Sequence, residues 1–353
     1  MGAMTPAAAP AAGLEPVLAA YGAAGSPVAP LGAGLINQTF VVDAPQGRFV
    51  LQRLHPIFQA AINADIDVVT RHLAGQGLVT PLLVRTATGA LWVEQDAAVW
   101  RALTWIDGVA LDRLGLPGQA REAGRVLAGF HRALGPLRHR FQNARPGVHD
   151  TARHLANLRA ALARHAGHRR YAAVEPLARR ILAAAAGLPA LEAVPERIVH
   201  GDPKAGNILF SHEGQHALCL VDLDTLAHMQ LPLELGDAFR SWCNPGGEDH
   251  AQACFSLELF RAAVTGYAEA AAGFVTAAEW RSLVTATHRI YVELAARFCA
   301  DALEESYFGW NARDFASASE HNQRRAESQM AAAASLAAQA TQAEAVVRAA
   351  FDG

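Results

Sequence analysis

Cysteine is scarce in this 353-residue chain, and its copies are far apart. The four stand at Cys219, Cys243, Cys254 and Cys299, and no two of them form a C-x-x-C pair. That spacing lacks the ligand pattern of a zinc site and gives no support to a disulfide framework. We therefore expect buried free thiols in a reducing compartment, which predicts a cytoplasmic location.

A large net charge and long apolar runs are also absent. Lys and Arg number 30 against 33 Asp and Glu, so the formal charge is only -3, and composition predicts no nucleic acid partner and no membrane partner. No run of about 18 apolar residues occurs. The Ala/Pro-rich start, residues 1–13, lacks the basic and apolar regions of a signal peptide. We expect this start to be disordered.

The remaining sequence, in a chain that is 52% hydrophobic, can bury two cores. Its first part predicts a helix near 14–23, a hairpin between 28 and 55, a helix near 60–76 and at least two strands over 82–106. From about residue 118 apolar residues recur at helical spacing, and the Ala-rich stretch 317–350 predicts a packed helix. With a break at Asp107-Gly108, we expect an α+β protein with a β-rich N-terminal lobe, 14–106, and a mainly helical C-terminal lobe, 107–353.

Polar residues gather after short strands in the second part. The stretch "IVHGDPKAGNILF", residues 198–210, predicts two strands around a polar loop, and "ALCLVDLDTL", residues 217–226, places two aspartates after another strand. The order H-G-D-x-x-x-x-N, strand, D matches the catalytic loop and metal-binding residue of eukaryotic-type kinases. In that pattern Asp202 is the catalytic base, and Asn207 and Asp222 hold Mg²⁺. Singly, a His-Gly-Asp can be an ordinary turn and a D-x-D a solvated loop, but their order favours phosphoryl transfer.

The same residues carry a resemblance to a known family. Through "HGDPKAGNILF", "LVDLDT" and "LELGDAFR" the second lobe resembles the aminoglycoside phosphotransferase and choline kinase group of small-molecule kinases. Over residues 32 to 335 the chain resembles one type of kinase within that group, the N-acetylhexosamine 1-kinases. The segments that carry this closer resemblance are "GLINQTFVV", "FVLQRLHPIF", "DALEESYFGW" and "HNQRRAESQM". This resemblance implies a protein-kinase-like two-lobe fold, with ATP as co-substrate, Mg²⁺ as cofactor and a small-molecule sugar as the acceptor, phosphorylated at its anomeric hydroxyl.

Further roles in the second lobe follow from the resemblance by position. Asp224 would lie near the metal as a supporting or substrate-binding group. Lys204, inside the loop, could offset charge on the moving phosphoryl group as a catalytic residue, although a solvent-facing lysine is the alternative. His200 and Asp237 are expected to brace the loop by hydrogen bonds.

The first lobe departs from the pattern of protein kinases, which use G-x-G-x-x-G and a strand lysine. "LGAGLINQTF" offers one G-x-G that ends at Gly34, followed by Asn37 and Thr39 as candidate phosphate donors. Gln52 stands where the lysine is expected, with Arg53 beside it. Since strand residues alternate between faces, only one of these two can point toward the nucleotide. Gln52 is favoured because it occupies the family position of the lysine, and Arg53 is the alternative because it alone of the two carries a charge.

For the acceptor, the resemblance indicates the segment around "DALEESYFGW", with Arg297 and Tyr307 as candidate substrate-binding residues. Arg297, Asp301 and Glu304 also fit an ordinary solvated helix face, because they are spaced i, i+4 and i+7. Because this segment mixes arginines with carboxylates, it suits a neutral polyol as the acceptor better than a polycation such as an aminoglycoside. A kinase of choline, homoserine or an aminoglycoside stays open, as does a catalytically silent kinase-like binding module.

Overall fold

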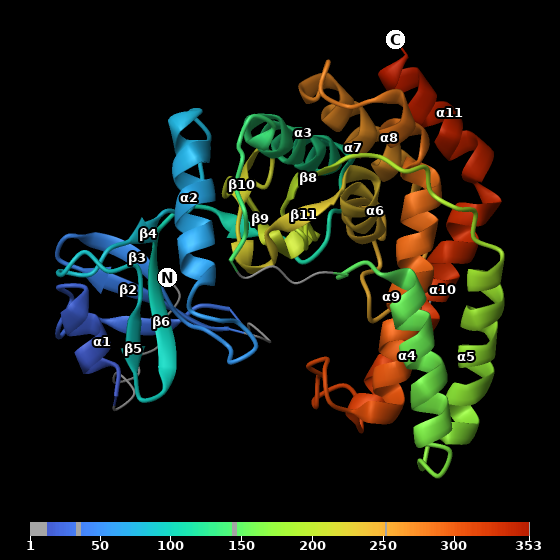
Figure 1. Cartoon of the computed structure of the whole chain (residues 1–353), viewed down its shortest axis with the longest axis horizontal. Coiled ribbons are helices and arrows are strands. Elements are labelled where there is room, and N and C mark those ends of the chain that lie inside the picture. Colours follow the sequence, from blue (N-terminus) through green and yellow to red (C-terminus); the bar gives the residue numbers. More distant parts are fainter. Residues whose placement is uncertain (1–12, 33–36, 143–146, 251–252, 353) are drawn as a thin grey trace. The chain divides into compact units, whose positions relative to one another are not determined.

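The structure is a computed structural model that describes residues 13–32, 37–142, 147–250 and 253–352. The chain folds into two compact units (Figure 1). The first ends at Asp107 and also includes a returning segment that begins at Pro136, whereas the second comprises Gly108–Gly135 and the rest of the chain. No sequence pattern indicated the returning segment.

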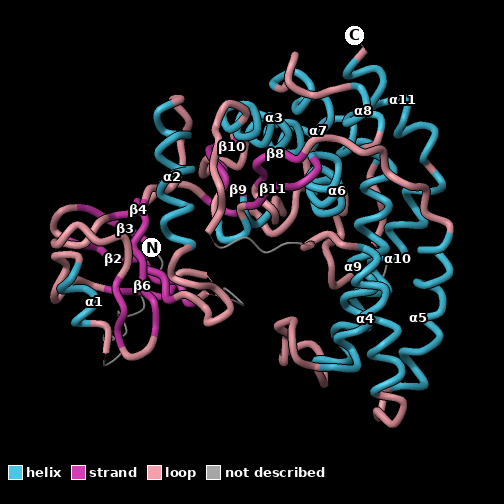
Figure 2. The backbone as a smooth tube through the Cα atoms, in the orientation of Figure 1, coloured by secondary structure: helices cyan, strands magenta, loops and turns pink. Residues whose placement is uncertain are grey.

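The first unit is built on an antiparallel sheet, drawn in magenta in Figure 2. Its strands run in the order β1-β2-β3-β6-β4, with β5 paired to β6. The hairpin expected around Pro-Gln-Gly is formed by β2 and β3, which pair from Gln38 with Arg53 to Ala44 with Gly47. The elements of this unit are α1 (Glu15–Ala20), β1 (Val28–Pro30), β2 (Gln38–Ala44), β3 (Gly47–Arg53), α2 (Ile62–Gly75), β4 (Leu83–Val84), β5 (Val93–Gln95) and β6 (Ala98–Thr104).

Strand alternation gives this sheet one apolar and one polar face. Leu51 of β3 and Ala102 of β6 are buried in a core that includes Leu18 of α1. Gln52 and Arg101, the next residues along the same strands, therefore lie on the opposite face. The sheet thus positions a polar row on the face away from α1.

The second unit is mainly helical, as the periodicity predicted. Two small groups of antiparallel strands, β10-β9-β7 and β11-β8, carry the polar loops. The elements are β7 (Val109–Ala110), α3 (Pro117–Leu134), α4 (Thr151–Arg164), α5 (Tyr171–Ala186), β8 (Glu196–Val199), η1 (Ala205–Asn207), β9 (Ile208–Phe210), β10 (Ala217–Leu220), η2 (Leu223–Thr225), β11 (Ala227–Gln230), α6 (Leu231–Trp242), α7 (Leu257–Ala270), α8 (Ala277–Arg281), α9 (Leu283–Glu304), α10 (Ala318–Ala338) and α11 (Ala340–Phe351).

Helix α9 is the centre of this unit, because it contacts α4, α5, α6 and α10 and is buried along most of its length (Figure 1). The Ala-rich stretch is helical and packed, as expected, but it forms two helices that meet at Gln339 rather than one: α10 packs along α9, and α11 packs mainly against α7. Elsewhere α3 and α7 pack closely, since a Cβ atom at Gly124 would lie 2.1 Å from the carbonyl oxygen of Ala263. Small side chains therefore let these helices approach one another.

The cysteines are free, as expected, and three of the four are buried. The expectation of buried thiols is wrong for Cys254, which is exposed. Its neighbours Ala253 and Phe255 are both buried, so the alternation of this short segment turns the thiol outward. In the part of the chain that the structure describes, no helix has the length and apolarity needed to cross a bilayer.

Candidate active site

The polar loop of residues 200–207 begins where β8 ends, and Gly201 makes its path possible. Gly201 has a φ of +85°, and a Cβ atom there would lie 2.1 Å from the carbonyl oxygen of Thr225. Any other residue would meet both backbone strain and a clash. The Thr225 hydroxyl donates to the carbonyl oxygen of His200 at 2.9 Å. The loop is therefore joined to the turn that carries the two aspartates.

Buried side chains hold the start of this loop. The carboxylate of Glu234, on α6, accepts the backbone N–H of His200 at 2.9 Å and that of Gly201 at 3.0 Å. Glu234 is fully buried. The ring Nε2 of His200 lies 2.9 Å from the carbonyl oxygen of Val221, which confirms the bracing role expected of His200.

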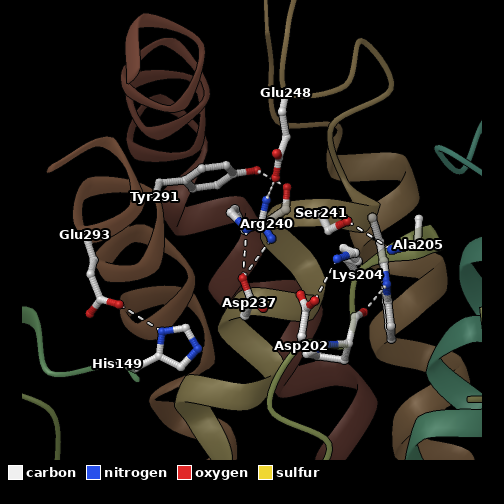
Figure 3. A network of polar contacts seen from close by, with 12 residues as sticks. His149, Asp202, Lys204, Ala205, Asp237, Arg240, Ser241, Glu248, Tyr291 and Glu293 are labelled. Carbon is white, nitrogen blue, oxygen red and sulfur yellow. Dashed lines mark hydrogen bonds and ion pairs between the residues drawn. The ribbon is translucent and has the colours of Figure 1, made fainter. Parts of the chain in front are cut away.

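Helix α6 supplies further support that the sequence did not indicate. The indole N–H of Trp242 donates to the carbonyl oxygen of Pro203 at 2.8 Å. The backbone N–H of Ala205 donates to the hydroxyl of Ser241 at 3.1 Å (Figure 3). Asp237 was expected to brace the loop, but its carboxylate pairs with Arg240, 2.8 Å away on the same helix. The bracing carboxylate of this helix is instead Glu234, three residues earlier.

Asp202 lies at the centre of the loop and has two side-chain partners. The ammonium of Lys204 donates to its Oδ2 at 2.7 Å. The amide Nδ2 of Asn207 donates to the same oxygen at 3.1 Å and to the carbonyl oxygen of Asp202 at 2.8 Å. The Asp202 side chain remains 30% exposed, so its carboxylate is fixed in orientation and still accessible.

The charge states of this pair follow from its geometry. Burial alone would raise the pKa of the Asp202 carboxyl, but the neighbouring Lys204 ammonium outweighs burial and lowers that pKa. Burial would likewise lower the pKa of Lys204, but the Asp202 carboxylate outweighs it and raises that pKa. Both groups are therefore charged at neutral pH.

Lys204 is distinctive for a second reason, since the printed sequence contains no other lysine. The remaining 29 of the 30 basic side chains are arginines. The first unit therefore has no lysine at any position, and the strand lysine of protein kinases has no counterpart there. The one ammonium side chain of the protein lies beside the expected catalytic base.

Asn207 and Asp222 lie at the same end of a strand pair. Asn207 directly precedes β9, Asp222 follows β10, and the carbonyl oxygen of Asn207 accepts the N–H of Val221 at 2.9 Å. Asp222 is exposed and adopts a left-handed backbone conformation with a φ of +63°, and Asp224 is buried on the following turn. The structure thus brings together the carboxylates and the amide predicted from the sequence.

These oxygens fit Mg²⁺ in kind. The described residues contain no group of three or more His, Cys, Asp and Glu side chains that could hold a metal by themselves. Mg²⁺ at phosphoryl-transfer sites is usually held by one or two protein oxygens together with phosphate and water oxygens. Because Nδ2 of Asn207 is turned to Asp202, its amide oxygen points the other way. The amide oxygen and the Asp222 carboxylate are therefore a suitable pair of hard donors.

In the first unit the polar face of the sheet carries one row of side chains across three strands. Thr39, Gln52 and Arg101 stand opposite one another in register. The Gln52 amide donates to the Thr39 hydroxyl at 3.2 Å. Its carbonyl oxygen accepts two N–H groups of Arg101, at 2.9 and 2.7 Å. Arg101, only 1% exposed, also reaches Asn63 of α2.

Sequence reasoning missed Arg101, which places a buried positive charge beside the position of the absent lysine. Arg53 lies differently, with its guanidinium 6.0 Å from the ring centroid of Trp100 and its partner Gln38 on the neighbouring strand. Asn37 is buried, and its side-chain amide oxygen accepts the backbone N–H of His55 at 2.9 Å. Gly34 lies outside the described residues.

The expected acceptor segment follows α9. The Asp301 carboxylate accepts the backbone N–H groups of Ser306, Tyr307 and Phe308 at 2.9–3.0 Å, so it shapes this loop rather than joining a solvated helix face. Tyr307 is 56% exposed. The guanidinium of Arg297 lies 5.6 Å from the ring centroid of Phe308.

Solved structures share this architecture. An aminoglycoside phosphotransferase from Alicyclobacillus acidocaldarius is 16% identical with a TM-score of 0.59, and the match covers 97% of this chain and 98% of that one. A choline/ethanolamine kinase family protein from Mesorhizobium loti is 18% identical with a TM-score of 0.53 over 95% of each chain. An amicoumacin kinase in complex with AMP-PNP, Ca²⁺ and Ami is 13% identical with a TM-score of 0.59, covering 86% and 87%.

These likenesses define a kinase-like fold, with an antiparallel sheet in the first part and a helical second part, and they confirm the expected fold class. The phosphotransferase enzyme family matches residues 27–280. The chain belongs to that family. The coarser resemblance drawn from the sequence is therefore confirmed, and the narrower one to N-acetylhexosamine 1-kinases stays a prediction.

Proposed function

We propose that this protein is an ATP- and Mg²⁺-dependent kinase that transfers the γ-phosphate to a sugar hydroxyl, the anomeric hydroxyl of an N-acetylhexosamine or a related hexose. The observation that carries the proposal is the loop of residues 200–207. It holds the Asp202 carboxylate between Lys204 and Asn207, 2.7 and 3.1 Å away. Membership of the phosphotransferase enzyme family supports the reaction type.

In this proposal Asp202 orients the acceptor hydroxyl and takes its proton. The hydroxyl oxygen attacks the γ-phosphorus, the bond from that phosphorus to the bridging oxygen breaks, and ADP leaves. Because the pKa of Asp202 is lowered, chiefly by Lys204 against the effect of burial, the carboxylate is ready to accept at neutral pH. Lys204 then balances charge on the moving phosphoryl group.

The oxygens of Asn207 and Asp222 are the donors we propose for Mg²⁺, which when bound would neutralise phosphate charge. Asp224 is buried on the same turn as Asp222 and would help to hold these two metal donors in place. In the first unit we propose that Thr39 and the Gln52 amide, which Arg101 holds in place, donate to the nucleotide. Asn37 would fix the start of the strand. Arg53 is the alternative to Gln52 as the nucleotide donor. The solved amicoumacin kinase, with AMP-PNP and Ca²⁺, supports a nucleotide and divalent-metal reaction.

The acceptor segment favours a sugar by its chemistry. Tyr307 and Trp310, 56% and 38% exposed, lie on the loop shaped by Asp301, and aromatic rings pack well against the apolar faces of sugars. Arg297 adds donors for hydroxyl oxygens. Kinases of an aminoglycoside, choline or homoserine are the alternatives within enzymes. A silent binding module is the alternative of another class.

The test is a coupled ADP-release assay with ATP and Mg²⁺ over free sugars, choline, homoserine and aminoglycosides, with phosphorus NMR of the product. We expect an anomeric sugar phosphate. Asp202→Asn should lower kcat by about 10²- to 10⁴-fold, because it removes the proton acceptor, and should leave nucleotide affinity nearly unchanged.

The exposed residue Asp112 gives the matched control, Asp112→Asn, which should keep full activity. Near wild-type turnover in Asp202→Asn would contradict the catalytic assignment. Turnover of an amino alcohol alone would keep the kinase and discard the sugar, whereas nucleotide binding without turnover of any acceptor would favour the silent module.

A further inference from the structure

A second cluster of polar side chains lies in the same unit, between the start of α4 and helix α9. His149, just before α4, has its Nδ1 2.9 Å from the carboxylate of Glu293 on α9 (Figure 3). The hydroxyl of Thr151 donates to the other oxygen of that carboxylate at 2.6 Å. Glu293 is 1% exposed and the His149 side chain 4%. This ring is therefore held rigidly in a buried position.

The other ring nitrogen of His149 is unsatisfied. Its Nε2 is buried and has no hydrogen-bond partner among the described residues. A buried polar atom without a partner costs about 1–3 kcal/mol, which an oxygen atom of a ligand at this position would recover. Figure 3 shows the ring between Glu293 and Asp237, in the same view as Asp202 and Lys204.

Arg297 is the second group with unused donors. It stands four residues after Glu293 on α9, hence on the same helix face. Within the described residues its guanidinium makes no hydrogen bond or ion pair, and it lies 5.6 Å from the ring centroid of Phe308. Glu293 is occupied by His149 and Thr151. Among the described residues, the Nε2 of His149 and the guanidinium of Arg297, which interact electrostatically, are therefore both without an oxygen partner.

Charges on every neighbouring element act on His149. Burial would lower its pKa, but the hydrogen bond to Glu293 and the charge of Asp237 on α6 outweigh burial and raise it, while Arg297 opposes them. On α4, burial lowers the pKa of His154, and Arg297 and Arg153 lower it further. Asp237 itself is paired with Arg240. The protonated form of His149 is thus favoured by its surroundings, in contrast to that of His154.

We propose that His149 and Arg297 together bind the acceptor, which presents an oxygen atom to both, so that the site selects an uncharged or anionic oxygen-rich molecule over a cationic amine. This inference rests on the kinase function proposed above and narrows its substrate class. Glu293 and Thr151 act as positioning residues that hold the imidazole. An ammonium group would meet two positively charged donors here and would be excluded.

The test begins with binding, which needs no turnover. Thermal stabilisation of the protein would be measured with N-acetylglucosamine, glucuronate, choline and kanamycin as the probes, each without nucleotide. We expect stabilisation by one of the two oxygen-rich sugars and none by the two cations. Stabilisation by choline or kanamycin would overturn the inference and leave the kinase function standing. Stabilisation by a sugar without any ADP release would overturn the kinase function alone.

Kinetics with the best acceptor then test His149 itself. His149→Leu should raise the KM of the acceptor by about 10- to 100-fold, because a charged donor is lost, and should leave the KM of ATP unchanged. In the wild type the acceptor KM should rise with pH through the raised pKa of His149. His149→Gln, whose amide donates at every pH, should recover much of the affinity and lose that pH dependence.

The matched control is His288→Gln, which changes a partly buried histidine on α9, the helix of Glu293 and Arg297, and should leave both KM values unchanged. If His149→Leu does not fold, the pH dependence of the acceptor KM in the wild type and in His149→Gln still tests the role of His149. An acceptor KM that is independent of pH in the wild type, or that His149→Gln leaves equally pH-dependent, would overturn the role of His149.

Discussion

At the scale of single residues, the positions of Lys204 and Arg101 explain why a glutamine stands where protein kinases have a lysine. The only lysine pairs with Asp202, and the first unit uses Arg101, held by Gln52, beside the position where protein kinases have their lysine. A lysine at position 52 would bring a second cation against a guanidinium that is 1% exposed. The glutamine is therefore a consequence of Arg101, since its carbonyl oxygen can accept what a lysine would repel.

We predict that Gln52→Lys lowers the free energy of unfolding by about 1–3 kcal/mol, because two hydrogen bonds to Arg101 are lost. Gln52→Glu keeps acceptor oxygens for Arg101 and should be at least as stable as the wild type, although it should raise the KM of ATP through repulsion of phosphate. Urea unfolding measures the first effect and steady-state kinetics the second.

The control is Gln76→Lys at an exposed glutamine after α2, which should change neither quantity. If Gln52→Lys were as stable as the wild type, the explanation of the absent lysine would be wrong.

Which residues could be predicted from sequence depends on how far apart their partners lie. Asp202, Asn207 and Asp222 stand within one short stretch, so their spacing alone indicated a loop and an adjacent strand end. Gln52 and Arg101 are 49 residues apart, and Glu234 lies 34 residues from its partner His200. Such contacts form only once the strands and α6 are folded together, so no local sequence pattern indicates them.

At the scale of elements, the long helices and the hairpin followed from periodicity and the strands around residues 200–207 from short apolar runs, whereas the two-residue strands could not be predicted. Strands such as β7 and β4, two residues each, are too short for alternation to be read. The spacing of Arg297, Asp301 and Glu304 also fitted an ordinary solvated helix face, but the Asp301 carboxylate accepts three consecutive backbone N–H groups of the following loop and the amide of Asn322, at 2.9–3.0 Å. One carboxylate therefore shapes the loop that carries the exposed aromatic residues.

For this loop we predict that Asp301→Ala destabilises the protein by about 1.5–3 kcal/mol, the range for hydrogen bonds to a charged group. It should also raise the KM of the acceptor while leaving the KM of ATP unchanged, because Tyr307 would lose its position. Thermal unfolding and steady-state kinetics measure these effects. Asp314→Ala, at an exposed position of the same loop, is the control, and an equal effect there would refute the special role of Asp301.

At the scale of the whole molecule, each unit organises its polar set with its own contacts. The row on the sheet of the first unit is held by Arg101 and α2, and the loop of the second unit is held by α6 and the turn after β10. Much of each polar set is therefore formed before any ligand binds, which lowers the ordering cost of binding.

We predict that ATP or a non-hydrolysable analogue stabilises the protein only in the presence of Mg²⁺. At a ligand concentration of about 100 times Kd the stabilisation should be about 2.7 kcal/mol, and hence a rise in Tm of several degrees. EDTA or Asp222→Ala should abolish most of it, and Asp352→Ala at an exposed position should not. Full stabilisation in EDTA would argue against metal-dependent nucleotide binding.

The single lysine also decides how this protein can be handled at the bench. The Lys204 side chain is 44% exposed, and reagents that acylate amines have only this side chain and the α-amino group to attack. Coupling the protein through amines to a sensor surface, or labelling it with an amine-reactive dye, would place the attachment at the loop beside Asp202. Immobilisation through the exposed thiol of Cys254 or through an affinity tag would avoid that loop. The same scarcity makes the fraction of acylated lysine, read by mass spectrometry, a direct report on the occupancy of one place in the protein.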